Sequence, residues 1–256
     1  MATPQNQDKA IQKISSYMRS DMVKQRFSET IGNGNSGAYI SSVLLAVAEN
    51  EALQKCTLES IYTSAMRAAS LRLSVDPSTG QAYLVPYGAR ATLIVGYKGL
   101  QDMAVRTGKY RYINVTPIYE GEKVEENRIS GFHSISGGKE SKTIIGWLAA
   151  FEMYAGFAHT MYMTVEEIHE HAQKYSKSYE NPKGGWKTDT HAMERKTVLR
   201  LLLRKWGYLD PADATVLEEI ENDSPPIDVD AIDPAYLPDS QEYTKTEDEL
   251  MKELGY

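Results

Sequence analysis

Cationic and aromatic side chains alternate through residues 87–112. This stretch carries five basic residues against a single acid, Asp102. The bases are Arg90, Lys98, Arg106, Lys109 and Arg111, and the rings between them are Tyr87, Tyr97, Tyr110 and Tyr112. Cations can follow a phosphate backbone while rings stack on bases, which is the combination that a sequence-tolerant single-strand binder needs. The pattern therefore predicts a nucleic-acid contact, with a solubilising surface as the alternative.

A second basic group lies on a helix that Asp189 is expected to cap and that runs to Trp206. Lys196, Arg200 and Arg204 are spaced i, i+4 and i+8, so they share one stripe of that helix, and no acid falls among them. A merely solvated helix face usually mixes signs. This stripe is therefore the strongest single binding candidate in the sequence.

The aromatic residues allow two interpretations. Tyr97, Tyr112 and Trp186 fit either a place in the core or a stacking contact with a base. Trp186 and Lys187 belong to a polar, basic and aromatic loop that precedes the basic helix. We therefore keep all four residues as candidates for DNA binding.

Motifs for nucleotide hydrolysis and metal binding are missing from the sequence. A nucleotide-driven motor would need a P-loop, and no G-x-x-x-x-G-K-[ST] pattern occurs. The single cysteine, Cys56, and the five histidines lack metal-ligand spacing. Neither a nucleotide cofactor nor a bound metal is expected.

One enzymatic alternative stays open. Glu140 and Lys142 form an E-x-K pattern just before a predicted strand at Ile144, and Glu120 lies upstream. A carboxylate pair holding a metal beside a lysine is a constellation that nucleases use for in-line attack on phosphodiesters. Three-residue matches of this kind are common by chance, and charged residues on a solvated loop are the simpler interpretation.

Charge is divided unevenly along the chain. Residues 1–209 hold 26 Lys and Arg against 20 Asp and Glu, whereas residues 210–256 hold 2 against 15. The net charge of −7 therefore belongs to the C-terminal end and does not argue against a polyanion partner for the rest. The acidic, proline-containing composition of this end predicts a disordered tail. An adaptor that binds only protein through the tail is a further alternative.

Hydrophobic periodicity predicts an α+β chain with about five strands. Strands are expected at residues 83–85, 91–95, 110–118, 144–154 and 158–163, with helices starting after Thr57, at Tyr97 and at a capping box on Thr164. Residues 120–142 are expected to form a long loop or a loose hairpin. Residues 32–37 predict a flexible break, with Ser36 as the N-cap of the next helix.

The same patterns divide the chain into three regions. Residues 1–35 are expected to form a helical arm that packs either on the body of the protein or on a neighbouring subunit. Residues 36–209 are expected to form a core, and residues 210–256 an acidic, mostly disordered tail in which residues 246–254 could form a short helix. The sequence has no apolar run long enough to span a membrane. Its single cysteine suits a reducing cytoplasm.

Two motif blocks occur in order along the chain. The first contains V-P-Y at 85–87, G-Y-K-G at 96–99 and R-T-G at 106–108. The second contains W-K at 186–187, A-M at 192–193, K-T-V at 196–198 and K-W-G at 205–207. Together they resemble the RecT family of phage and prophage single-strand annealing recombinases, over residues 58–209.

The resemblance implies an ATP-independent, non-enzymatic protein that coats single-stranded DNA, assembles into rings or helical filaments and pairs complementary strands during homologous recombination. It also implies a small antiparallel sheet packed with a helical bundle, with a DNA-binding groove between them. Lys196, Arg200 and Lys205 fall within the shared pattern, whereas Arg204 lies outside it. The expected setting is a bacterial cytoplasm, with single-stranded DNA and annealing intermediates as ligands, and with a host single-stranded-DNA-binding protein and a phage exonuclease as candidate partners.

Overall fold

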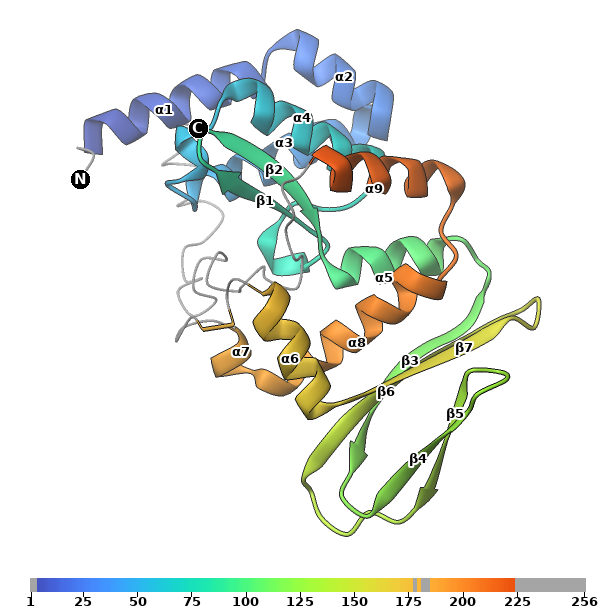
Figure 1. Ribbon diagram of the computed structural model, residues 1–256. Helices are drawn as coiled ribbons and strands as arrows, with labels where there is room; N and C mark the ends of the chain where they lie inside the picture. The colour runs from blue at the N-terminus through green and yellow to red at the C-terminus, as the bar shows by residue number, and fades with distance from the viewer. Residues whose placement is uncertain (1–3, 177–178, 181–184, 224–256) are drawn as a thin grey trace.

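The structure is a computed structural model that describes residues 4–176, 179–180 and 185–223. These residues form the predicted α+β fold. In Figure 1 a helix-rich part lies above a sheet-rich part, and two helices, α5 (Tyr97–Arg106) and α8 (Thr190–Trp206), lie between them. The chain passes from one part to the other through α5 and returns to the helix-rich part after α8.

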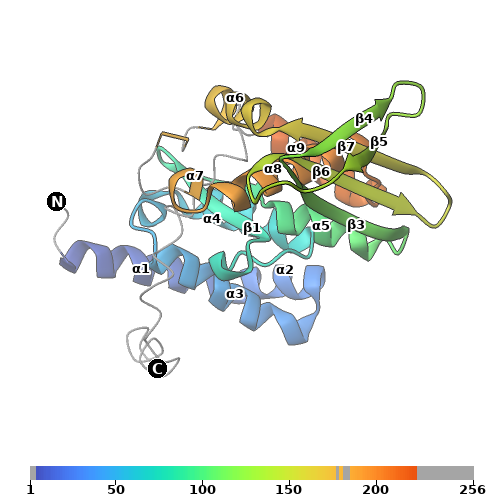
Figure 2. The ribbon, with the colours of Figure 1, turned by 90° about the horizontal axis from the view of Figure 1, so that it is seen from below.

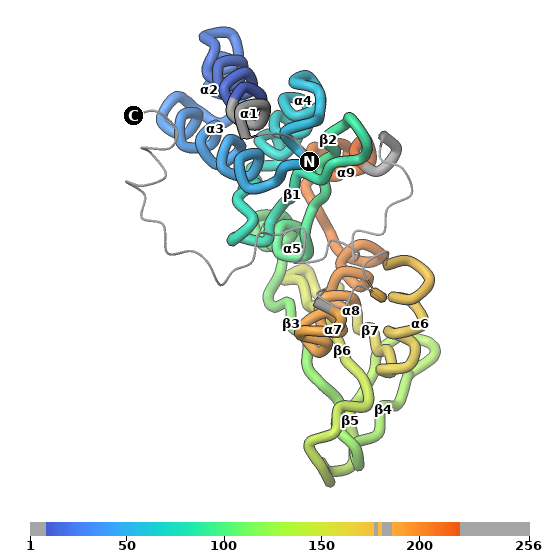
Figure 3. Tube along the Cα trace, turned by 90° about the vertical axis from the view of Figure 1, so that its left-hand side faces the viewer, coloured from blue at the N-terminus to red at the C-terminus, as the bar shows by residue number. Residues whose placement is uncertain are grey.

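The helix-rich part contains most of the N-terminal half of the chain. Its elements are α1 (Pro4–Met18), α2 (Asp21–Ile31), α3 (Asn33–Ala48), α4 (Leu58–Ser70), and the antiparallel pair β1 (Ala82–Tyr87) and β2 (Arg90–Val95). Met18 of α1, Phe27 of α2 and Ile61 of α4 are fully buried and belong to one apolar core that continues into the sheet-rich part. Figure 3 shows the first three helices gathered at the end of the molecule opposite to the β4 and β5 strands described below.

The connection between α2 and α3 differs from its prediction. Gly32 alone separates the two helices, with a φ of 85° that favours glycine, and Asn33 already begins α3. Ser36 lies inside α3, where its buried hydroxyl donates to the carbonyl of Asn33. The predicted flexible break and the Ser36 cap are therefore wrong, because glycine and asparagine at a helix start were mistaken for a loop.

Helix α4 holds the outer edge of β2 through side chains. The Thr57 hydroxyl accepts from the amide of Ser60, which confirms the predicted helix start. The Ser60 hydroxyl accepts from the amide of Ala91 at 2.9 Å, and the Ser64 hydroxyl donates to the carbonyl of Ala91 at 3.0 Å. These serines satisfy backbone groups that a two-stranded sheet would otherwise leave unpaired.

The sheet-rich part contains five strands. Strands β3 (Tyr110–Tyr119), β6 (Ile144–Met153) and β7 (Ala158–Thr164) form an antiparallel sheet in the order β3-β6-β7, and β4 (Glu122–Asn127) pairs with β5 (Phe132–Gly137) in a separate hairpin. The described residues thus form seven strands in three sheets, rather than about five strands in one. Of the two interpretations of residues 120–142, the hairpin is confirmed.

A β-bulge at the start of β3 changes which side chains share a face. Tyr110 pairs with Met153 while Tyr112 pairs with Glu152, so Arg111 is the extra residue. Simple alternation along a regular strand would place Arg111 on the same face as Ile113, which packs against the core. The guanidinium of Arg111 instead contacts the carboxylate of Glu152 on the outer face of the sheet. Tyr112 is the cross-strand partner of Glu152.

Helices cover the inner face of the three-stranded sheet. They are α6 (Val165–Tyr175) and α8, and the short α7 (Gly185–Thr188) packs on α8; Figure 2 shows the strands lying across α8. The capping box of Thr164 and Glu167 and the Asp189 cap are both present as predicted. Because α8 packs on β6, β7, β3 and α5, its side chains occupy the centre of the molecule.

A last helix, α9 (Pro211–Asp223), returns to the helix-rich part and contacts α4. Its Asp213 and Ile220 are buried. The prediction of disorder from residue 210 is therefore wrong for α9, because the apolar residues of this segment find a surface on α4. Residues 224–256, including the short helix expected at 246–254, lie outside the described residues.

Candidate nucleic-acid interface

The two predicted basic segments meet where α8 ends and β3 begins. The Tyr110 hydroxyl donates to the carbonyl of Tyr208 at 2.9 Å and accepts from the amide of the same residue. The ammonium of Lys109 lies 3.5 Å from the centre of the Tyr208 ring, in a cation–π contact. Burial raises the pKa of Tyr110, and the bond to the Tyr208 backbone offsets part of that rise. The hydroxyl is therefore a fixed neutral link between the two segments.

Several predicted DNA-binding residues gather around this link. Arg111 and Tyr112 follow Tyr110 on β3, and Tyr112 is 45% exposed, which leaves ring surface open to solvent. Arg204 and Lys205 are exposed at the end of α8. We refer to these exposed groups as the junction surface, which consists of Lys109, Arg111, Tyr112, Arg204 and Lys205. Arg111 also pairs with Glu152 at 2.8 Å, so its charge is partly balanced.

The predicted stripe on α8 is not uniformly accessible. Lys196 is half-buried, Arg200 is only 6% exposed, and Arg204 is exposed. The i, i+4 spacing does place them along one side of the helix, but that side turns inward at its centre because α8 packs on both the sheet and α5. In this conformation the end of the stripe, rather than its middle, faces solvent.

Arg106 is held by contacts within the protein. Its Nη2 donates to the carbonyl of Leu71 at 2.8 Å, and its Nε lies 3.2 Å from a carboxylate oxygen of Asp102. Nη2 also lies 3.9 Å from Asp213 on α9. Burial raises the pKa of the Asp213 carboxyl, while Arg106 and then Arg72 lower it. Arg106 thus connects α5 to the end of α4 and to α9.

Trp186 lies in the core, at 2% exposure, between the rings of His169 and Tyr179. The structure therefore favours the core interpretation over base stacking for this residue. Lys187 is exposed beside it, with its ammonium 5.2 Å from the Tyr179 ring.

A buried carboxylate organises the same region. Glu194 of α8 is 1% exposed and accepts from the indole nitrogen of Trp147 on β6 at 2.9 Å. Its two oxygens also contact His169 of α6 at 3.0 Å and His191 at 2.9 Å. His169 in turn contacts the Tyr179 hydroxyl at 2.8 Å. The sequence did not predict this cluster, because Trp147 of β6 and His169 of α6 lie far from Glu194 along the chain and only packing brings them together.

The remaining predicted residues lie apart from the junction surface. Lys98, near the start of α5, is exposed and runs alongside Gly80. Tyr97 is half-buried against the core. The neighbouring Tyr83 is also half-buried, and its burial, together with the charge of Tyr97, raises the pKa of Tyr83 to about 12. Arg90 is exposed at the first position of β2, beside a pocket in the helix-rich part.

The alternative nuclease residues lie at the base of the β4–β5 hairpin. Glu120 accepts from the Ser141 hydroxyl at 2.8 Å, and the Glu140 amide donates to the Glu120 carbonyl at 2.8 Å. Glu120, Glu140 and Lys142 are all exposed, as the solvated-loop interpretation expects. In the part of the chain that the structure describes, no cluster of three or more His, Cys, Asp or Glu side chains is arranged to hold a metal ion.

Comparison with known proteins identifies the family. The model of the RecT family matches residues 37–230. The chain belongs to the RecT family. It is 39% identical over 210 residues to "Uncharacterized protein YqaK" of Bacillus subtilis (strain 168), a match that covers 81% of this chain and 72% of that protein. It is 26% identical over 201 residues to "Protein RecT" of Escherichia coli (strain K12), covering 73% of this chain and 71% of that protein.

Membership of the RecT family implies, at the level of the family, a role in annealing single-stranded DNA that involves no enzymatic reaction. The family match continues past Leu209 to residue 230, so it includes α9. The motif resemblance had ended at Leu209. Among the residues described, no helix is both long and apolar enough to cross a membrane.

Proposed function

We propose that this RecT-family protein binds single-stranded DNA at the junction surface and pairs it with a complementary strand without ATP. The supporting observation is the double contact between Tyr110 and Tyr208, which are 98 positions apart in the sequence. It brings Lys109 and Arg111 to the end of the helix that carries Arg204 and Lys205. This contact supports the proposal that the two basic segments, which the sequence predicts separately, bind one strand together.

The chemistry of this surface fits an annealing protein. Its cations hold the strand by its phosphates and release counterions, which gives affinity without reading the sequence. The exposed ring of Tyr112 offers a stacking platform for a base. Held in this way, the strand keeps its pairing edges free for a complement, and duplex formation drives the reaction without nucleotide hydrolysis.

The larger assembly extends this proposal. Copies placed side by side would present a long single strand to its complement, in a ring or a helical filament, with the N-terminal helices as an expected contact between copies. The same proposal includes a DNA-binding groove between sheet and helices, to which Arg90, Lys98, Lys187 and Lys196 contribute. It also includes a partnership with a single-stranded-DNA-binding protein or an exonuclease. Analytical ultracentrifugation with and without oligonucleotide measures the assembly.

The decisive experiment compares Lys109→Ala and Lys205→Ala with Lys24→Ala, an exposed control on α2. Binding of a fluorescent oligo-dT is measured by anisotropy across a salt series. Each junction variant is expected to lower the magnitude of the slope of log K against log salt by about 0.7, and the control should leave it unchanged.

Annealing itself is measured by quenching between two labelled complementary strands, in EDTA and without nucleotide. We expect wild type to anneal under these conditions and both junction variants to anneal more slowly. Wild-type slope and rate in folded Lys109→Ala and Lys205→Ala proteins would contradict the proposed site. Shortened strands after incubation with Mg²⁺ would instead favour a nuclease that uses Glu120, Glu140 and Lys142.

A further inference from the structure

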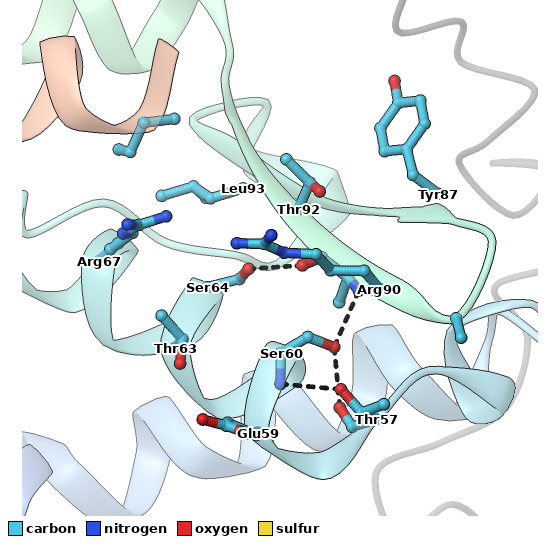
Figure 4. A pocket seen from close by; sticks show the side chains of 13 residues that line it. Thr57, Glu59, Ser60, Thr63, Ser64, Arg67, Tyr87, Arg90, Thr92 and Leu93 are labelled. Carbon is cyan, nitrogen blue, oxygen red and sulfur yellow. Dashed lines mark hydrogen bonds between the residues drawn. The ribbon is translucent and has the colours of Figure 1, made fainter. Parts of the chain in front are cut away.

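A pocket of about 580 Å³ opens in the helix-rich part, and none of the junction-surface residues lines it. One wall is α4 from Thr57 to Arg67, the opposite wall is the β1–β2 turn and β2, and Ile220 of α9 closes one side. The bonds from Ser60 and Ser64 to Ala91 fix the distance between the walls (Figure 4). The pocket is therefore a built feature and not a gap between loosely packed elements.

The charged groups of the pocket are mainly cationic. Arg67 and Arg90 extend from opposite walls toward one another, as Figure 4 shows, and Glu59 is the single acid among the lining residues. Hydroxyls of Thr57 and Thr63 and the half-buried ring of Tyr87 complete the lining. Two guanidinium groups facing one space favour an anionic occupant, and carboxylates match their fork geometry.

The chain itself carries such an occupant next to the pocket. Helix α9 brings Ile220 into the pocket wall and ends at Asp223, after which residues 224–256 hold nine acids against two bases. Asp228, Asp230 and Asp233 are the first of these acids, spaced between Ile227, Val229 and Ile232. Helix α9 ends at Asp223, five positions before Asp228, and an extended chain of that length reaches roughly 16–18 Å beyond the helix end.

We propose that the pocket between α4, β2 and α9 is the docking site for the acidic segment around Asp228–Asp233 of the same chain. Arg67 and Arg90 bind its carboxylates. Because the segment is tethered at the pocket edge, its effective concentration there is on the order of millimolar, so weak individual ion pairs suffice. Charge complementarity and the path of α9 both favour this occupant.

The docked segment also has a consequence for DNA binding, which rests on the function proposed above. Arg90 is one of the predicted DNA-binding residues, so a phosphate backbone and the acidic segment would compete for it. Free protein would then keep its acidic segment folded back, and bound single-stranded DNA would displace it.

The test uses the full-length protein with Arg67→Lys or Arg90→Lys, which places an amine in the pocket at little structural cost. A carbodiimide couples an amine directly to a carboxylate that it contacts, with no spacer between them. Peptide mass spectrometry then identifies the crosslinked residues. Arg128→Lys, at the exposed tip of the β4–β5 hairpin, is the matched control. We expect crosslinks from positions 67 and 90 to the acids at 228–233, with yields about tenfold above the control because of the tether.

An equal mixture of ¹⁵N-labelled and unlabelled protein identifies the chain that supplies the carboxylate. Crosslinked peptide pairs that are both labelled or both unlabelled support the proposal. If every pair joins a labelled to an unlabelled peptide, a second copy docks instead, and the proposal is overturned. Pocket yields equal to those of Arg128→Lys also overturn it.

Oligo-dT is then added before crosslinking. A fall in pocket yield supports competition for Arg90. If the protein fails to bind oligo-dT by anisotropy while the pocket crosslinks persist, the function proposed above fails and the docking site stands, so the two failures are distinguishable.

Discussion

Replacing Arg106 by Ala is expected to destabilise the fold rather than to act mainly on DNA. The sequence places Arg106 in a basic segment, but its guanidinium is bonded to the Leu71 carbonyl at 2.8 Å and to Asp102 at 3.2 Å. A charged hydrogen bond contributes about 1.5–3 kcal/mol, and a half-exposed helix pair adds about 0.3–0.5 kcal/mol. Asp213, at 3.9 Å, adds little. We therefore expect a loss of about 2–3 kcal/mol.

That loss corresponds to a fall of roughly 4–12 °C in Tm for a domain of this size. Differential scanning calorimetry measures it, with Lys98→Ala on the same helix as the control. Lys98 is exposed, and its removal is expected to change stability by less than about 0.5 kcal/mol. If Lys98 contacts phosphate, its variant shows the opposite pattern, with a reduced salt slope and an unchanged Tm.

Arg106→Lys separates the two roles within one position. Lysine keeps the charge but cannot donate hydrogen bonds to Leu71 and Asp102 at the same time. The Tm of the lysine variant should therefore fall nearly as far as that of the alanine variant. A phosphate contact, by contrast, would survive this replacement. A wild-type Tm in Arg106→Ala, accompanied by weaker DNA binding, would refute the structural role argued for this residue.

Three further predictions concern the core. Trp186→Ala is expected to lower the free energy of unfolding by about 3–5 kcal/mol in urea denaturation, because the side chain is buried; wild-type stability with lost DNA affinity would show a stacking role instead. Glu194→Ala should cost about 1–3 kcal/mol for the unpaired Trp147 N–H alone, and Glu194→Gln less, by the same assay; equal losses would show that the acceptor is irrelevant. Burial raises the pKa of Asp213, so the folded state prefers its protonated carboxyl. The contribution of this carboxyl to the free energy of unfolding is therefore fully present below the unfolded pKa of about 3.9, and it is lost as pH rises through the raised pKa of the folded state. Asp213→Asn should therefore gain Tm relative to wild type as pH rises from about 4 to 7 in thermal scans, and a pH-independent difference would contradict this assignment.

Local chemistry was sufficient to predict several elements of this protein. Thr57, Thr164 and Asp189 cap helices where their side chains predicted, because a cap depends on residues only three positions apart. The short apolar and β-branched runs of β1, β2, β6 and β7 and the helical period of α5 likewise depend on short-range pattern. The family motifs also lie within such runs, so the RecT resemblance was available from the sequence.

Tertiary packing decided what these elements present to solvent. Arg106 and Arg200 belong to basic patterns in the sequence, yet Arg106 bonds to Leu71 and Asp102, and Arg200 is buried. α9 folds because α4 offers its apolar residues a surface, which no acidic composition predicts. The bulge at Arg111 moves one side chain to the other face of β3, since one extra residue reverses alternation. The start of β3 and the end of α8 meet through Tyr110 and Tyr208, because a contact across such a separation depends on the whole path of the chain between them.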